Sequence, residues 1–187
     1  MRYGNPDGTN IDYIIGQREG SLGPYLKTHQ VFKCPADKSL TKLDDGKSYP
    51  RVRSYSMNGN MGSTAHSPQG LSAIVLKRSD IVSGSRSELC VFMDIHEDYI
   101  DDCQYTISWG GMGYESFFNL PATRHGGSGV LSFTDGRAEI HRWKDSRTFQ
   151  AVKGTHGVPV NAPGSLDWRY VYQLTTKDMG VDPTHEW

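Results

Sequence analysis

The sequence predicts a domain built mainly of antiparallel β-sheet, with a few short helices and long irregular loops. Its 187 residues include 21 glycines and 9 prolines, a content that favours many turns and few long helices. Residues 88–93 form a nearly continuous apolar run after a Ser/Gly-rich stretch, which is typical of a buried strand. Residues 128–143 alternate in polarity around an Asp-Gly pair, and this pattern predicts a β-hairpin.

The length is that of a single domain, and we expect one globular unit over residues 1–187. Residues 1–50 are a turn-rich entry segment, residues 51–145 hold the sheet core, and residues 146–187 form an irregular tail with aromatic anchors (Trp168, Tyr170 and Tyr172). The formal net charge of −1, without a run of Lys or Arg, argues against a nucleic-acid partner. No stretch approaches the roughly 20 apolar residues that span a bilayer.

The elements before the hairpin are short. We expect a short helix or turn in the entry segment that docks Tyr25, Leu26 and Phe32 on the core. Residues 51–57 alternate in polarity and predict a strand, and residues 71–76 are a brief apolar run.

The hairpin turn has a specific expected geometry. If Asp135 and Gly136 are the only turn residues, a two-residue type I′ loop is favoured, because both positions need a positive φ. That loop would place Leu131 opposite Ile140 in the ladder.

His125 precedes the first arm of this hairpin by a few residues. An extended arm would hold His125 and Asp135 about 30 Å apart, which is too far for two ligands of one metal ion or for a base and its orienting group. We therefore interpret His125 as a cap at the start of the arm, and Asp135 with Gly136 as the turn. All three are structural residues in this interpretation.

Three cysteines, Cys34, Cys90 and Cys103, cannot all pair within one chain. One disulfide with a leftover thiol and three free thiols both remain open. The sequence contains no Cys-x-x-Cys, and this argues against a zinc-finger or thioredoxin-like motif.

An acidic segment follows the predicted buried strand. It could be a solvated loop, or it could bind Ca²⁺ through carboxylate oxygens. A pair of its carboxylates could also serve glycoside hydrolysis, with Trp109 stacking on a sugar. The candidate metal ligands are Asp94, Glu97, Asp98, Asp101 and Asp102, and the candidate catalytic residues are Asp94, Glu97 and Asp98.

Other catalytic signatures are missing from the sequence. It has no Gly-x-Ser-x-Gly, no phosphate-binding loop and no His-Glu-x-x-His. No enzyme class is therefore assigned, and a hydrolase of the glycosidase type is the one considered.

The segments 124–127 and 133–136, with His125 and Asp135 nine residues apart, resemble the signature of the prepilin-type, processing-associated H-x9-DG proteins. These are pseudopilin-like proteins related to type II secretion protein G. Further segments resemble the family in the same order along the chain: 22–26, 31–37, 54–59, 92–98, 100–102, 120–122, 143–148 and 167–176.

This resemblance implies an α+β fold like a pilin head and a structural or interaction role in a bacterial secretion or type IV pilus-like system. It implies other pilin-like subunits or self-association as partners, and a location in the cell envelope or outside the cell. Two departures stand out: Arg137 follows the Asp-Gly where the family usually has His, and the family's apolar N-terminal helix is not in this sequence. Membrane contact is expected only through that helix.

Two alternatives remain from the residues themselves. One is a secreted carbohydrate-active protein that binds or hydrolyses a polysaccharide on a pilin-like scaffold. The other is a calcium-dependent adhesion module, in which Ca²⁺ is the cofactor.

Overall fold

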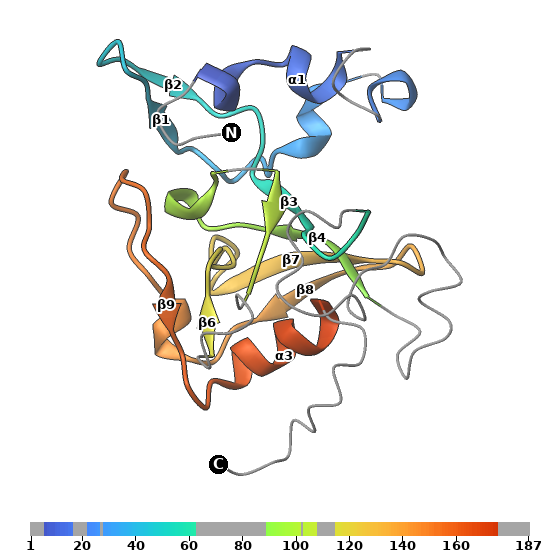
Figure 1. The fold of residues 1–187 in the computed structure, drawn as a ribbon, viewed down its shortest axis with the longest axis vertical. Coiled ribbons are helices and arrows are strands. Elements are labelled where there is room, and N and C mark those ends of the chain that lie inside the picture. Colours follow the sequence, from blue (N-terminus) through green and yellow to red (C-terminus); the bar gives the residue numbers. More distant parts are fainter. Residues whose placement is uncertain are drawn as a thin grey trace.

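The computed structural model describes residues 6–16, 22–26, 28–62, 89–101, 103–107 and 115–175. It confirms an α+β fold that is mainly antiparallel, with two short α-helices among the described residues. In Figure 1 the N-terminal segment lies at one end of the molecule, the main sheet lies in the middle, and the last helix crosses at the opposite end. The predicted apolar run at 71–76, together with Asp102 and Trp109, falls outside the described residues.

The main sheet has five strands in the order β5-β3-β4-β7-β8. All neighbouring strands are antiparallel except β3 and β5, which are parallel. The sequence-predicted strand at 88–93 is confirmed as β4, which pairs with β7, the first arm of the predicted hairpin. The bounds are β3 Tyr55–Asn58, β4 Cys90–Asp94, β5 Gln104–Tyr105, β7 Ser128–Phe133 and β8 Ala138–Arg142.

The remaining regular elements are small. Two pairs of short strands, β1 Leu40–Lys42 with β2 Ser48–Pro50 and β6 Ser116–Phe117 with β9 Val160–Asn161, form separate antiparallel ladders. The α-helices are α1 Asp12–Ile15 and α3 Leu166–Thr175. Neither helix, within the described part of the chain, combines the length and apolar character needed to cross a membrane. Short 3₁₀ helices occupy Pro6–Thr9, Gly23–Tyr25, His29–Phe32, Glu97–Tyr99 and Ser146–Thr148.

Helix α3 corrects the expectation of an irregular tail. Its Trp168, Val171 and Leu174 belong to the same buried cluster as Met93 and the other inward side chains of the sheet. Burial of these apolar side chains supplies the stability that the weak sequence periodicity did not reveal, because tertiary packing rather than propensity stabilises most short helices. The predicted tail aromatics therefore sit on a helix.

The hairpin is confirmed, but its predicted register is wrong by one residue. Leu131 pairs with Glu139, and Ile140 pairs with Val130 and is 68% exposed. The loop has three residues rather than two: Gly136 has φ +90°, and the Phe133 amide hydrogen-bonds to the Arg137 carbonyl at 3.0 Å. A type I turn followed by a left-handed glycine produces this geometry. The extra loop residue moves every pair in the ladder.

The entry segment packs along the face of the main sheet that lies opposite helix α3. Side chains of β3, β4 and β7 alternate, so that Tyr55, Phe92 and Val130 point away from α3. They line an apolar hollow of about 370 Å³ together with Leu26 and Phe32. Both entry residues are partly buried, as expected, but the prediction for Tyr25 is wrong because its side chain is 83% exposed.

Candidate functional site

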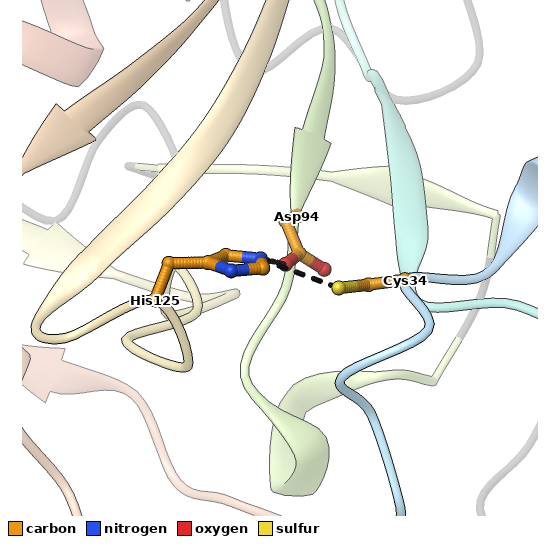
Figure 2. Close-up of side chains that lie close together, drawn as sticks. All are labelled: Cys34, Asp94 and His125. Atoms are coloured by element: carbon orange, nitrogen blue, oxygen red, sulfur yellow. Dashed lines mark hydrogen bonds and ion pairs between the residues drawn. The ribbon is translucent and has the colours of Figure 1, made fainter.

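Three chemically reactive side chains from distant segments meet beside the end of β4. Figure 2 shows Cys34, Asp94 and His125 pointing toward one another. Cys34 Sγ lies 3.3 Å from His125 Nε2, and the same nitrogen lies 3.9 Å from Asp94 Oδ2. The Asp94 side chain is fully buried, and His125 remains 30% exposed. We call these three residues the Cys-Asp-His cluster, and His125 is its solvent-exposed member, since Cys34 is buried like Asp94.

A tight turn brings His125 to this position. Residues 120–122 run beside the end of β4, since the Ala122 amide donates to the Asp94 carbonyl at 2.8 Å. The chain then reverses through Gly126 and Gly127, whose φ values of +64° and +85° are readily adopted only by glycine. His125 is held at the bend, directly over the Asp94 carboxylate.

Cys34 is held against the sheet by Ser54. The Cys34 amide donates to Ser54 Oγ at 2.8 Å, and the Ser54 amide donates to the Phe32 carbonyl at 2.9 Å. The Ser54 carbonyl in turn accepts from the Ile95 amide at 3.0 Å. The segment before β3 therefore fixes both the entry segment and the residue that follows Asp94.

Arg124 supplies the positive charge of the site. Its side chain is only 7% exposed and pairs with the Asp94 carboxylate. It also pairs with Glu97 Oε1 at 2.9 Å, and it donates to the Ile95 carbonyl at 2.9 Å. Burial alone would lower the pKa of Arg124, but the two carboxylates outweigh it and raise that pKa, so the guanidinium stays charged.

The Asp94 carboxylate is only half satisfied. Arg124 occupies Oδ1, whereas Oδ2 is buried and has no hydrogen-bond partner among the described residues. Burial raises the pKa of Asp94, although Arg124 and, after it, the Ser54 hydroxyl and His125 act in the opposite direction. The pKa of the nearby Tyr55 is also shifted. Burial is the largest cause, the charges of Asp94 and Cys34 add to it, and together they raise the pKa of Tyr55 to about 12. An unpaired buried carboxylate oxygen is unfavourable, and such an atom requires a physical reason.

The geometry distinguishes two kinds of chemistry. In a nucleophilic triad the thiol and the carboxylate contact different nitrogens of the imidazole, so that one ring nitrogen accepts the proton and the other is oriented. Here Cys34 and Asp94 both approach Nε2 of His125. The sulfur, nitrogen and oxygen atoms lie within 4.8 Å of one another. They converge on one point, an arrangement that suits a shared cation better than a proton relay.

The sequence-predicted carboxylates point to different partners. Asp94 and Glu97 share Arg124, but Asp98 is buried and accepts from the Lys153 and Gly154 amides at 2.7 and 2.9 Å. Asp101 accepts from Asn119 at 3.0 Å and lies 3.5 Å from His156. Within the described residues, the one group of three candidate ligands is Cys34, Asp94 and His125. A calcium cage made of the acidic segment stays a prediction without support from the described carboxylates.

The two halves of the signature motif are separated in space. Asp135 lies in the hairpin loop, where its carboxylate accepts from the Arg137 amide at 3.0 Å and pairs with Arg137 Nε at 3.4 Å. His125 lies instead in the Cys-Asp-His cluster. The interpretation of His125 as a cap does not account for its contacts with Cys34 and Asp94. Asp135 and Gly136 do form the loop, as predicted.

Sequence reasoning missed two members of the site, Cys34 and Arg124. All three cysteines are free thiols in the structure, with Cys34 and Cys90 buried and Cys103 exposed. The shared order of the family-like segments was the only available signal, because Cys34 and Arg124 both lie within such segments.

Comparison with known proteins adds no relative. Neither a family model, nor a curated protein, nor a solved structure matches this chain.

Proposed function

We propose that this chain is a pseudopilin-like structural and interaction domain of a bacterial secretion or type IV pilus-like system, located in the cell envelope or outside the cell. Its partners would be other pilin-like subunits or further copies of itself. The proposal rests on the family-like segments of the sequence and on the place where they meet.

One observation supports this function most. The segments that resemble the H-x9-DG family are separated by tens of residues, yet they join around the Cys-Asp-His cluster through Cys34, Ser54, Asp94, Arg124 and His125. Side chains that hold each other in a buried network position backbone segments. The shared segments are thus accounted for by a common scaffold.

The carbohydrate-active alternative receives less support. A glycosidase needs two carboxyl groups about 5–10 Å apart that face the scissile bond in an accessible groove. Asp94 is fully buried, Asp98 is occupied by backbone amides, and Glu97 is paired with Arg124. The described residues therefore present no open pair of carboxylates in the acidic segment.

Crosslinking in the producing bacterium tests the proposal. Cells carrying a tagged full-length protein are treated with an amine-reactive crosslinker, and the crosslinked peptides are identified by mass spectrometry. We expect crosslinks to a second copy or to subunits that begin with a pilin-type helix. Crosslinks confined to unrelated cytoplasmic proteins would contradict the proposal.

A second assay separates this function from glycan hydrolysis. The purified protein is incubated with a panel of polysaccharides, beside Glu97→Gln and the exposed control Asp44→Asn. We expect no release of sugar by any of the three. Hydrolysis that is lost in Glu97→Gln but kept in Asp44→Asn would replace the scaffold proposal by the enzymatic one.

A further inference from the structure

We propose that Cys34, Asp94 and His125 bind one divalent transition-metal ion of the Zn²⁺ type, through Sγ, Oδ2 and Nε2. The ion would join the entry segment, the end of β4 and the turn before β7. This inference does not depend on the partner or location of the protein, and it differs from a calcium site in the acidic segment.

The distances between the donor atoms are close to those of a zinc site. Zinc binds Cys sulfur at about 2.3 Å, and His nitrogen and carboxylate oxygen at about 2.0–2.2 Å, so tetrahedral geometry separates sulfur from nitrogen by about 3.6 Å and nitrogen from oxygen by about 3.4 Å. The corresponding distances here are 3.3 Å and 3.9 Å. Sulfur and oxygen, which a tetrahedral zinc ion would hold about 3.6 Å apart, lie within 4.8 Å of each other here, so binding requires these side chains to close by at most about 1 Å.

The unpaired oxygen of Asp94 points to a missing cation. Oδ2 is buried, has no hydrogen-bond partner among the described residues, and faces the other two donor atoms. Arg124 holds Oδ1 and thereby orients the carboxylate, as residues behind a metal ligand commonly do. A metal ion on Oδ2 would give this oxygen the partner that Arg124, bound to Oδ1, does not supply.

The charges of the site balance once a divalent ion is bound. Asp94 and Glu97 are two anions that share the single cation Arg124. When Cys34 binds the metal as a thiolate, its proton passes to solvent, which adds one negative charge. A divalent cation then brings this buried group of charges to zero.

The ligand types select the class of metal. A thiolate and an imidazole suit zinc and related borderline ions, whereas Ca²⁺ and Mg²⁺ prefer sites made of oxygen alone. With three protein ligands, a fourth position remains for a water molecule. The 30% exposure of His125 gives the ion a path to the otherwise buried cluster.

Metal titration of the purified full-length protein tests the site. The protein is reduced, treated with a chelator and exchanged into chelator-free buffer, and Zn²⁺ or Co²⁺ is then added. We expect one tightly bound ion per chain, and with Co²⁺ a thiolate-to-cobalt charge-transfer band and intense tetrahedral d–d absorption. At a Zn²⁺ concentration a hundred times its Kd, we expect Tm to rise by about 5–10 °C, with no rise for Ca²⁺.

Matched variants identify the ligands. Cys34→Ser and His125→Gln remove one donor each, and Cys103→Ser and His156→Gln are controls of the same residue types outside the cluster. Loss of a residue that only supports a metal ligand typically lowers metal affinity by roughly 10–100-fold. Because Cys34 and His125 would bind the ion directly, their variants are expected to lose more affinity than this. Cys34→Ser is also expected to lose the charge-transfer band, and both controls should behave as the unchanged protein.

Three outcomes would overturn the site. They are binding of less than one Zn²⁺ per chain, a Co²⁺ spectrum without thiolate absorption, and equal affinity in ligand and control variants. If a ligand variant fails to fold in chelator, X-ray absorption on the zinc-loaded unchanged protein decides, because one sulfur at about 2.3 Å is required. The crosslinking assay above does not measure metal, so each proposal can fail without the other.

Discussion

At the scale of single residues, Arg124 controls the charge of the site. It is the cation that the fully buried Asp94 and the nearly buried Glu97 share, and its side chain is itself 7% exposed. Removing one partner of a buried ion pair leaves the other charge uncompensated, which is far more destabilising than loss of a surface pair.

Arg124→Gln is therefore expected to lower the free energy of unfolding by about 3–5 kcal/mol, as measured by urea denaturation. Arg137→Gln is the control, since the partly exposed Arg137 pairs with Glu139 at 2.5 Å near the hairpin loop. In this control the free energy of unfolding is expected to fall by about 0–1 kcal/mol. Equal losses in the two variants would show that the buried pairs of Arg124 contribute no more than a surface pair.

Asp145 is a second residue with a measurable electrostatic role. Its carboxylate accepts from the Arg147 amide and from Arg147 Nε, both at 2.9 Å, and caps the short helix Ser146–Thr148. The hydrogen bonds from Arg147 lower the pKa of Asp145 well below its usual range. A carboxyl with a lowered folded pKa stabilises the protein above its unfolded pKa, and this contribution is lost as the pH falls.

Asp145→Asn is accordingly expected to reduce the free energy of unfolding by about 1 kcal/mol near neutral pH, the usual effect of losing a helix cap. The difference from the unchanged protein should shrink as the pH falls below about 4, where the carboxyl begins to protonate in the unfolded chain. Urea denaturation at several pH values measures it, with the exposed Asp44→Asn as control. A difference that stays constant with pH would contradict the electrostatic explanation.

At the scale of elements, the hairpin of β7 and β8 depends on close packing around a glycine. A Cβ at Gly129 would lie 2.9 Å from the Ala122 carbonyl oxygen and 3.0 Å from a ring carbon of Trp143. The same Trp143 is buried and donates its indole N–H to that carbonyl at 2.8 Å. The glycine thus allows the indole to cross the strand and bond to the segment before His125.

Gly129→Ala is expected to destabilise the protein by about 1–3 kcal/mol, because an extra methyl group in a packed interior forces side chains or backbone to move. Urea denaturation followed by tryptophan fluorescence measures this loss. Gly8→Ala serves as control, since a Cβ at Gly8 would meet no atom within 4 Å. A loss no larger than that of the control would mean that Trp143 has room to shift.

The hairpin also shows how far local sequence predicts an element. The alternation of β7 and β8 and the Asp-Gly pair were sufficient to predict both strands and their connection. The register was not predictable from the dipeptide alone, because Asp-Gly fits both a two-residue loop and a three-residue loop with a left-handed glycine. The observed loop exposes Ile140 and turns Glu139 toward Tyr170, with which it hydrogen-bonds.

At the scale of the whole molecule, the sheet is covered differently on its two faces. Helix α3 buries one face through Trp168, Val171 and Leu174, and the entry segment covers the other only in part, leaving the apolar hollow beside Phe92. The Cys-Asp-His cluster sits where this entry segment meets the end of β4 (Figure 2). A metal ion there would tie the less extensively packed face to the sheet.

Patterns along the chain were enough to predict the fold class, the buried strand β4, the two arms of the hairpin and the acidic segment after β4. These follow from polarity patterns within about 20 residues, which local physical rules can interpret. Three features came to light only in the folded molecule: the one-residue shift in the hairpin, the helix α3, and the meeting of Cys34, Asp94 and His125. The register depends on which of two loops the Asp-Gly pair adopts. The helix and the cluster depend on packing between segments up to 91 residues apart, and no local pattern records which distant side chains will share one buried space.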